Sequence, residues 1–414
     1  MKKLFYQPKD AWVGDLIPYW EDGTFYGFYL HDPRIKGKEY AEETTWHLVT
    51  TKDFVNLDYK GESIRRGADD RPNKNAYTGS VIKDSNGIYH AFYTAYNEKF
   101  KINGKSIQSV MQATGSDLEH LETMEDFLFV ADGVLYEEFD WRDPFVFWNE
   151  EDGCYWMLLA SRLKDSGALR GGCIALCKSK DLINWSYEKP FYAPQMYVTM
   201  ECPEVFRMGE YWYLVYSTFS DCFTTHYRIA KSLDGPWMIP EDDVFDTRAD
   251  YAIKTASDGE HRYAFGWIAS KYGNCDFGPW EWGGTMVFHE LVQDQATGAL
   301  KVKVIPGVRD YYTKENEITQ ITSYNCELYK EKNAVDVMSQ TLGAGLYEIP
   351  HDCFSIELDV HVEQAHEFGI ALHVDKDMEQ GYFLRMNPRK KEMAWDMRSE
   401  EHTSELQSHH DLVC

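Results

Sequence analysis

Three acidic side chains lie at comparable positions along the chain and could take part in one reaction. The acids precede an aromatic residue within a segment of similar pattern by 10 to 12 residues: Asp15 precedes Phe25 by 10, Asp143 precedes Tyr155 by 12, and Glu201 precedes Trp212 by 11. Like charges that are brought together in a partly dry site raise one another's pKa, so one carboxyl stays protonated while another remains an anion. An acid beside an anionic nucleophile is what glycoside hydrolysis requires. A single carboxylate would be explained more simply as a hydrogen-bonded side chain at the end of a strand. Three carboxylates in equivalent positions favour a catalytic role.

These acids belong to a repeat that occurs five times. Each copy contains a segment rich in aromatic and other β-forming residues, and most copies begin with a turn signal such as Asp22-Gly23. A second repeated motif follows several of these segments, for example at residues 179–185, and indicates the turn between the outer strands. The repeated segments are residues 24–29, 88–93, 154–159, 211–216 and 262–267. Two hairpins per repeat predict a four-stranded antiparallel blade, and five repeats over about residues 10–305 predict a five-bladed β-propeller.

The strand before each repeated hairpin is the innermost strand of its blade in such a fold. Asp15, Asp143 and Glu201 all fall in this strand. Because innermost strands line the central channel of a propeller, we expect three blades to direct carboxylates into one funnel.

The chain is expected to be all-β with two domains. The five-bladed β-propeller catalytic domain takes residues 1–310, and residues 311–397 form a partial C-terminal β-sandwich, with alternating strands expected at residues 354–362 and 368–374. Residues 398–414 resemble the translation of a sequencing-library adapter, so we interpret them as an artefact tail without function. The sandwich would then be truncated, and its remaining strands would expose unpaired edges.

Four short segments around the acids resemble the motifs of a known family. They are Trp12-Val13-Gly14-Asp15, Tyr77-Thr78-Gly79-Ser80, Trp141-Arg142-Asp143-Pro144 and Met200-Glu201-Cys202-Pro203. In this order they look like the signature blocks of glycoside hydrolase family 32, the invertase, inulinase and levanase family. The resemblance implies a five-bladed propeller followed by a β-sandwich. It also implies a retaining hydrolase that cleaves the β-fructofuranosidic linkages of sucrose, fructo-oligosaccharides or fructans through a covalent fructosyl-enzyme intermediate.

The same resemblance implies roles for individual residues. Asp15 would be the nucleophile, Glu201 the general acid and then the general base, and Asp143 the transition-state stabiliser. Arg142 would share the work of Asp143. Further candidates for contacts with the sugar are Trp12, Tyr77, Trp282 and Ser80. For the three aromatic residues, packing in the core is an equally good interpretation, and the serine could merely end a strand.

One segment departs from the family pattern. Gly14-Asp15-Leu16-Ile17 stands where Asn-Asp-Pro-Asn is typical, so one amide contact with the sugar is lost. This leaves room for a less common linkage, a difructose anhydride or fructosyl transfer, because hydrolases and transferases use the same covalent intermediate. The residue pattern is also compatible with an inverting α-L-arabinofuranosidase or β-xylosidase of similar fold, and with a catalytically inactive sugar-binding propeller.

The bulk composition narrows the choice of partners. A net charge of −26 and a pI near 4.9 oppose binding to nucleic acid or to an anionic membrane, whereas an aromatic content of 15% suits a neutral sugar. We therefore expect a small-molecule or oligosaccharide substrate and leave the oligomeric state open. The nine cysteines lack metal-ligand spacing, so we expect reduced thiols, no metal and no cofactor. The sequence shows no signal peptide and no membrane span, which predicts a cytoplasmic protein.

Overall fold

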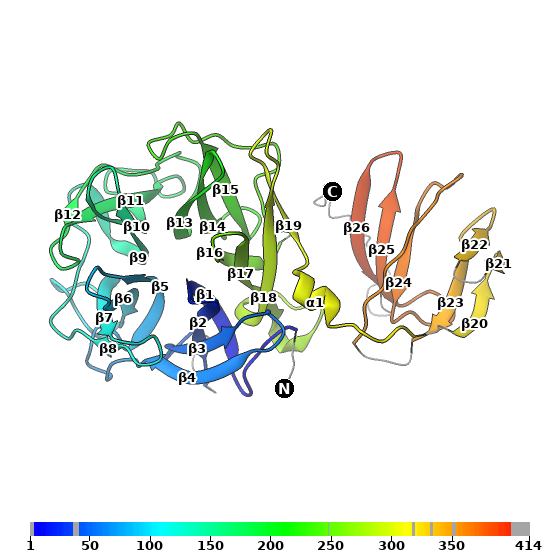
Figure 1. Ribbon diagram of the computed structural model, residues 1–414, viewed down its shortest axis with the longest axis horizontal. Coiled ribbons are helices and arrows are strands. Elements are labelled where there is room, and N and C mark those ends of the chain that lie inside the picture. The colour runs from blue at the N-terminus through cyan, green and yellow to red at the C-terminus, as the bar shows by residue number, and fades with distance from the viewer. Residues whose placement is uncertain are drawn as a thin grey trace. The chain divides into compact units, whose positions relative to one another are not determined.

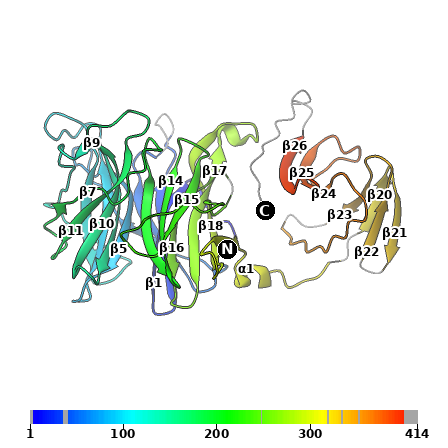
Figure 2. The same ribbon diagram turned by 90° about the horizontal axis from the view of Figure 1, so that it is seen from above.

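The structure of the chain is a computed structural model that describes residues 4–35, 41–246, 248–316, 319–331, 334–349 and 353–398. Contacts divide the chain into two compact units, Met1–Val308 and Arg309–Cys414. Within the described residues almost all regular structure is β-strand, as Figures 1 and 2 show. The two short helical segments are η1 (Tyr272–Asn274) and α1 (Pro306–Asp310).

The described strands of the first unit form four antiparallel sheets, one of which has eight strands. A single residue pair between β1 (Trp12–Glu21) and β18 (Trp280–Gln293) joins the two halves of that sheet, so we divide the unit into five groups of strands, blades I to V (Figure 1). Blade I contains β1 (Trp12–Glu21), β2 (Thr24–Asp32), β3 (Thr45–Thr51) and β4 (Asp58–Ile64). Blade II contains β5 (Asn75–Lys83), β6 (Tyr89–Tyr96), β7 (Ser109–Gly115) and β8 (Glu122–Thr123). Blade III contains β9 (Tyr136–Asn149), β10 (Cys154–Leu163), β11 (Gly172–Ser179) and β12 (Ser186–Tyr187).

The last two blades follow the same order of strands. Blade IV contains β13 (Glu201–Met208), β14 (Tyr211–Thr218) and β15 (Thr224–Ala230). Blade V contains β16 (Asp250–Ser257), β17 (Arg262–Lys271), β18 (Trp280–Gln293) and β19 (Leu300–Lys303). The expected fourth strand of blade IV is reduced to two isolated bridges to β15, between Ile229 and Met238 and between His226 and Val244. Pro236 and Pro240 flank the bridge at Met238 and cannot donate the backbone hydrogen bonds that would extend it.

The first strands of the five blades form a closed ring. Strand β1 contacts β5, β5 contacts β9, β9 contacts β13, β13 contacts β16, and β16 contacts β1. Five hydrophobic clusters fill the spaces between successive blades, and each draws most of its residues from two neighbouring blades. This arrangement confirms the five-bladed β-propeller that the repeat predicts.

Two local features hold the blades in this form. The turn of each repeated hairpin contains a glycine with positive φ, such as Gly23 at 73°. That conformation suits the tight turns that join antiparallel strands, so the turn signals in the sequence are confirmed. The ring is closed by pairing between the first and last blades, because Val13 pairs with Gly284 and the amide of Met286 donates to the carbonyl oxygen of Tyr6 at 2.9 Å.

The described part of the second unit contains three small antiparallel sheets. Strand β20 (Thr319–Tyr324) pairs with β23 (Ala344–Glu348), and β21 (Glu327–Glu331) pairs with β22 (Ala334–Met338). The third sheet contains β24 (Phe368–Leu372), β25 (Gly381–Asn387) and β26 (Glu392–Arg398).

Of the two strands expected here, the one at residues 368–374 is confirmed as β24, but the one at residues 354–362 is wrong. Residues 354–362 form no strand, and Ile356, Leu358 and Val360 are 42%, 58% and 54% exposed. Their alternating pattern has no partner strand among the described residues, and an unpaired strand leaves its backbone groups unsatisfied. The expected artefact tail at residues 398–414 lies outside the described residues apart from Arg398, the last residue of β26.

Among the described residues, no helix has the length and apolar character needed to cross a membrane.

Candidate active site

A cavity of about 800 Å³ is lined by side chains from the first strand of every blade. These side chains are Asp15 of β1, Thr78 of β5, Asp143 of β9, Glu201 of β13 and Tyr251 of β16. These five strands form the ring described above (Figure 1), so the cavity that their residues line lies at the centre of the propeller. The three acids identified in the sequence therefore meet in one place.

A β-bulge interrupts the pairing of the first two strands in every blade. The interruptions fall between Val13 and Leu16, Ala76 and Gly79, Arg142 and Phe145, Glu201 and Glu204, and Tyr251 and Lys254. Bulges re-aim side chains and are common next to active sites. The recurrence of one bulge in five blades explains how each first strand turns a polar side chain toward the cavity.

The three acids do not share a single register position, and this corrects the expectation of equivalent positions. Glu201 is the last paired residue before its bulge, Asp143 is the first residue inside its bulge, and Asp15 is the second. The similar intervals of 10 to 12 residues therefore hide three different positions relative to the bulge. Asp143 also adopts a positive φ of 57°, a conformation that a regular strand would not allow.

Asp15 is held by donors from two other blades. Its Oδ1 accepts a hydrogen bond of 2.8 Å from Nε1 of Trp267, and its Oδ2 accepts one from the hydroxyl of Thr78. Burial raises the pKa of Asp15 from 3.8 to about 6, and the charge of Asp143 adds to this rise, while the two donors and Lys254 oppose it. The side chain is therefore fixed in place and poised to ionise near neutral pH.

Glu201 accepts one hydrogen bond at each carboxylate oxygen. Nη2 of Arg142 lies 3.1 Å from Oε1, and the hydroxyl of Tyr251 donates to Oε2 at 2.5 Å. Burial raises the pKa of Glu201, and the charges of Asp143 and Asp15 act in the same direction, whereas Arg142 and Tyr251 lower it. Burial stabilises the protonated form of Glu201, whereas Arg142 and Tyr251 stabilise the ionised form. Both forms are therefore accessible, and Glu201 can give up a proton and take it back.

Asp143 is only 4% exposed and is fixed through its backbone and its carboxylate. Its amide donates to Oγ1 of Thr94 at 2.7 Å, and its Oδ2 accepts a hydrogen bond of 3.0 Å from the amide of Cys202. The thiol of Cys202 lies 3.7 Å from Oδ2 of Asp15 and 3.9 Å from Oδ2 of Asp143. Burial raises the pKa of this thiol well above 9.0, so it stays protonated and bridges the two carboxylates as a weak donor.

Arg142 is a cationic residue of the cavity wall. Its guanidinium donates to Asp140, to Gln108 and Thr199 at 3.2 Å each, and to Glu201. Burial opposes its charge, but the carboxylates of Glu201 and Asp140 outweigh burial and raise the pKa of Arg142. A guanidinium with several fixed partners cannot swing away, so it positions Glu201 as well as charging the cavity wall.

The aromatic candidates divide into two groups. Tyr77 and Trp282 line the cavity, as expected for walls of a sugar pocket. Trp12 is not among the lining residues, and its ring instead stacks against the guanidinium of Arg34 at 4.5 Å. Ser80 is also outside the lining set, because its hydroxyl is buried and accepts a hydrogen bond of 2.9 Å from the amide of Val146.

The glycine at residue 14, where the family pattern has asparagine, packs against the ring of Trp282. A Cβ atom on Gly14 would lie 2.2 Å from Cη2 of Trp282, which is closer than any real contact of this kind. The Trp282 ring therefore occupies the space next to Asp15 into which an asparagine side chain at this position would extend.

Sequence reasoning gave no role to three side chains whose O–H or N–H groups donate to the carboxylates of the acids. Thr78 and Tyr251 lie in the first strands of blades II and V, so applying the repeat register to all five blades would have found both. Trp267 lies in β17, a second strand, and no sequence signal marks its contact with Asp15 across the boundary between blades V and I.

Comparison with known proteins identifies the family. The sequence profile of the glycosyl hydrolases family 32 N-terminal domain matches residues 5–300. The chain belongs to glycoside hydrolase family 32. This confirms the resemblance drawn from the four motif segments.

Relatives within family 32 support this membership over different lengths. Sucrose-6-phosphate hydrolase of Escherichia coli is 28% identical over 218 residues, which cover 51% of this chain and 42% of that protein. The match thus spans less than half the length of this curated relative. The structure of sucrose-6-phosphate hydrolase from Lactobacillus gasseri is similar with a TM-score of 0.64 at 16% identity, covering 91% of this chain and 73% of that one.

A second solved structure agrees. Fructan 1-exohydrolase IIa from Cichorium intybus is similar with a TM-score of 0.64 at 17% identity, covering 94% of this chain and 79% of that one. At these identities the likeness shows the fold alone. Since both similarities extend past the propeller, the family 32 chain has the all-β fold of a five-bladed propeller followed by a β-sandwich.

Proposed function

We propose that this family 32 protein is a retaining glycoside hydrolase that cleaves β-fructofuranosidic linkages. The observation that carries the proposal is the meeting of Asp15, Asp143 and Glu201 in one central cavity, each held by donors from its surroundings. Two carboxyls of raised pKa in a buried site meet the needs of a nucleophile and a general acid. The names of the family 32 relatives, which refer to sucrose-6-phosphate and fructan hydrolysis, agree with this substrate class.

The first half of the reaction joins the fructosyl group to the enzyme. The ionised carboxylate of Asp15 attacks the anomeric carbon while protonated Glu201 gives its proton to the departing oxygen. The bond between the anomeric carbon and that oxygen breaks, and an ester to Asp15 forms. Thr78 and Trp267 hold the Asp15 carboxylate during the attack.

The second half releases the sugar. Glu201, now an anion stabilised by Arg142 and Tyr251, takes a proton from water, and the resulting hydroxide attacks the anomeric carbon. The ester breaks, Asp15 leaves as an anion, and the second displacement restores the original configuration.

Asp143 and Arg142 act on the charge that develops between these steps. Asp143 is positioned to accept hydrogen bonds from ring hydroxyls, which strengthen as positive charge grows on the sugar. Its fixed backbone and the hydrogen bond from the Cys202 amide keep this carboxylate from reorienting. Arg142 offsets part of the negative charge through its ion pairs with Asp143 and Glu201.

The packing of Trp282 against Gly14 favours a substrate other than sucrose alone. An asparagine amide is absent at this position, and an aromatic ring stands in its place on the cavity wall. Such a wall offers stacking rather than a directional hydrogen bond, so it suits a further sugar unit, a difructose anhydride or an acceptor for fructosyl transfer. A location in the cytoplasm stays a prediction.

A panel of substrates tests the proposal. The wild type is incubated with sucrose, inulin, levan, a difructose anhydride and arabinan, and the products are identified by chromatography. We expect fructose or fructo-oligosaccharides from at least one fructoside, loss of this activity in Asp15→Asn, and normal activity in Asp126→Asn, which changes an exposed aspartate. Release of arabinose without fructose would instead support an inverting arabinofuranosidase, and binding of fructan without turnover would support a sugar-binding propeller.

A further inference from the structure

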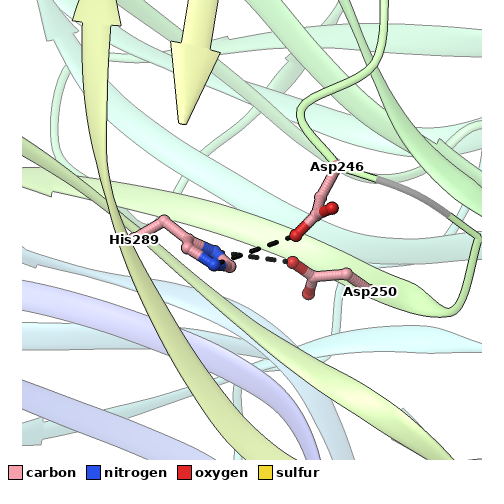
Figure 3. Close-up of side chains that lie close together, drawn as sticks. All are labelled: Asp246, Asp250 and His289. Carbon is pink, nitrogen blue, oxygen red and sulfur yellow. Dashed lines mark ion pairs between the residues drawn. The ribbon is translucent and has the colours of Figure 1, made fainter. Parts of the chain in front are cut away.

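A second group of chemically active side chains lies in blade V, apart from the residues that line the cavity. Asp246 precedes β16, Asp250 begins β16, and His289 lies in β18 (Figure 3). Each of the three offers one ligand atom, and these atoms all lie within 4.8 Å of one another. Two carboxylates and one imidazole at this spacing form a set of donors that metal ions bind.

Asp250 is the unusual member of this group. Its side chain is 6% exposed, and neither carboxylate oxygen has a hydrogen-bond partner among the described residues. Buried carboxylates normally have hydrogen bonds or a cation, because removing a charge from water without compensation is costly. Figure 3 shows the carboxylate directed toward the His289 ring, where Oδ2 lies 3.7 Å from Nδ1.

The strand between these residues is shaped to let them meet. Asp250 in β16 and His289 in β18 flank β17, and a Cβ on Gly266 of β17 would lie 2.5 Å from Oδ1 of Asp250. Only glycine therefore leaves room for the carboxylate to cross the middle strand. The Asp250 side chain reaches toward His289 through this gap.

A second triad of the same residue types in the neighbouring blade shows a different geometry. His226 lies 3.0 Å from Asp221 through Nε2 and 3.0 Å from Asp243 through Nδ1. Those distances are direct hydrogen bonds, so protons on the ring satisfy both carboxylates. In the blade V group the corresponding distances are 3.7 and 3.8 Å, which are too long for hydrogen bonds.

We propose that Asp246, Asp250 and His289 bind one divalent transition-metal ion of the Zn²⁺ class. Zinc lies about 2.0–2.2 Å from nitrogen and carboxylate donors, so its ligand atoms are separated by roughly the spacing found here after small side-chain rotations. An imidazole with two carboxylates suits Zn²⁺ and its first-row neighbours better than Mg²⁺ or Ca²⁺, which take oxygen ligands. His289 is 21% exposed and Asp246 is 32% exposed, which leaves an entry path.

The ion would join three parts of blade V. It would connect the segment before β16 to β16 itself and to β18, on both sides of β17. Asp250 also directly precedes Tyr251, whose hydroxyl donates to Glu201. The bound ion would therefore stabilise the last blade and fix the start of the strand that supplies this donor.

Binding of zinc to the full-length chain tests the site without use of enzymatic activity. After treatment with EDTA and removal of the chelator, the protein is titrated with ZnCl₂ by calorimetry, and its melting temperature is measured with and without ZnCl₂. We expect one zinc per chain and a higher melting temperature with zinc. Binding should weaken at least about tenfold in Asp250→Asn and in His289→Gln, and it should be unchanged in His120→Gln, which alters an exposed histidine with an 80% exposed side chain.

Three results would overturn the proposal. They are a wild-type chain that neither binds zinc nor melts at a higher temperature with it, equal zinc binding in the wild type and both site variants, and stabilisation by MgCl₂ or CaCl₂ but not by ZnCl₂. If Asp250→Asn does not fold, His289→Gln and the wild-type titration decide the question, because the histidine is partly exposed and less important for the core.

Discussion

The buried position of Asp15 makes its ionisation unfavourable for the stability of the fold, and its proposed role as the nucleophile explains this position. Its carboxylate is surrounded by protein and shares the cavity with Asp143, and these two effects raise its pKa to about 6 against an ordinary value of 3.8. The folded state therefore holds the proton of Asp15 more tightly than the unfolded chain does. Such a group stabilises the fold below its unfolded pKa, and this contribution is lost as the pH rises through the folded pKa.

Replacement of Asp15 by asparagine should stabilise the protein while it abolishes activity. In the wild type the ionisation of Asp15 costs up to about 3 kcal/mol once the pH exceeds 6. Asp15→Asn has no such cost, so its free energy of unfolding should exceed that of the wild type at about pH 8 and approach it at about pH 4. Chemical denaturation at both pH values measures this, and an advantage of equal size at both would contradict the assigned pKa.

The hydroxyl of Thr78 should set the acid side of the pH profile. It donates to Asp15 and so lowers the pKa of that carboxyl. In Thr78→Val the donor is lost, the pKa of Asp15 rises, and the acid limb of kcat/KM should move to higher pH.

The control for this variant is Thr114→Val in β7, which does not line the cavity. Its acid limb should match that of the wild type. A Thr78→Val limb that stays in place or moves to lower pH would show that Asp15 does not control it.

At the scale of the strand, the bulge in each first strand is the element that creates the site. In blade II it lies between Ala76 and Gly79, and it brings β5 so close to β6 that a Cβ on Gly79 would lie 1.8 Å from the carbonyl oxygen of Phe92. The carbonyl oxygen of Gly79 also accepts a hydrogen bond of 2.7 Å from the buried Nζ of Lys254 in blade V. The bulge therefore has no room for a side chain at Gly79.

A pair of glycine variants tests this constraint. Gly79→Ala should lower the free energy of unfolding by more than about 3 kcal/mol, because backbone atoms cannot move aside. Gly27→Ala in β2 is the matched control, since its Cβ would meet only ordinary contacts starting at 3.4 Å and should change stability by less than about 1 kcal/mol. Similar losses in both variants, measured by denaturant titration, would contradict the packing at the bulge.

The strands themselves could be predicted from the sequence, whereas the bulges could not. The hairpin segments alternate and follow glycine turns, so local patterns specify them, and the position of the acids before them identified the first strands. The positions of Asp15, Asp143 and Glu201 relative to the bulges could not be predicted, because a bulge depends on pairing between strands. Contacts such as Trp267 with Asp15 join residues 252 positions apart and leave no local trace.

At the scale of the whole molecule, the propeller depends on the join between its first and last blades. The carbonyl oxygen of Tyr6 accepts from the amide of Met286, and the Tyr6 ring packs edge-on against Tyr29 with 6.0 Å between centroids. These contacts tie the start of the chain to blade V and to blade I. They also close the ring of strands around the cavity.

Removal of residues 1–8 should therefore weaken the entire propeller. We expect the free energy of unfolding to fall by about 1–3 kcal/mol, because one backbone hydrogen bond and one buried aromatic contact are lost. Removal of residues 399–414 is the control and should leave the melting temperature unchanged, in line with the artefact interpretation of that tail. An equal effect of both truncations would contradict the role given to Tyr6.

The covalent intermediate offers the most direct measurement of the central claim, that Asp15 bonds to the sugar while Glu201 moves the proton. The variant Glu201→Gln is mixed with a fructosyl donor whose leaving group needs no acid, such as fructosyl fluoride, and its intact mass and peptides are measured by mass spectrometry. The account predicts a mass increase of one fructosyl unit on the peptide that contains Asp15, and no adduct in the double variant with Asp15→Asn. An adduct on another residue, or a first-formed product of inverted configuration without any adduct, would contradict it.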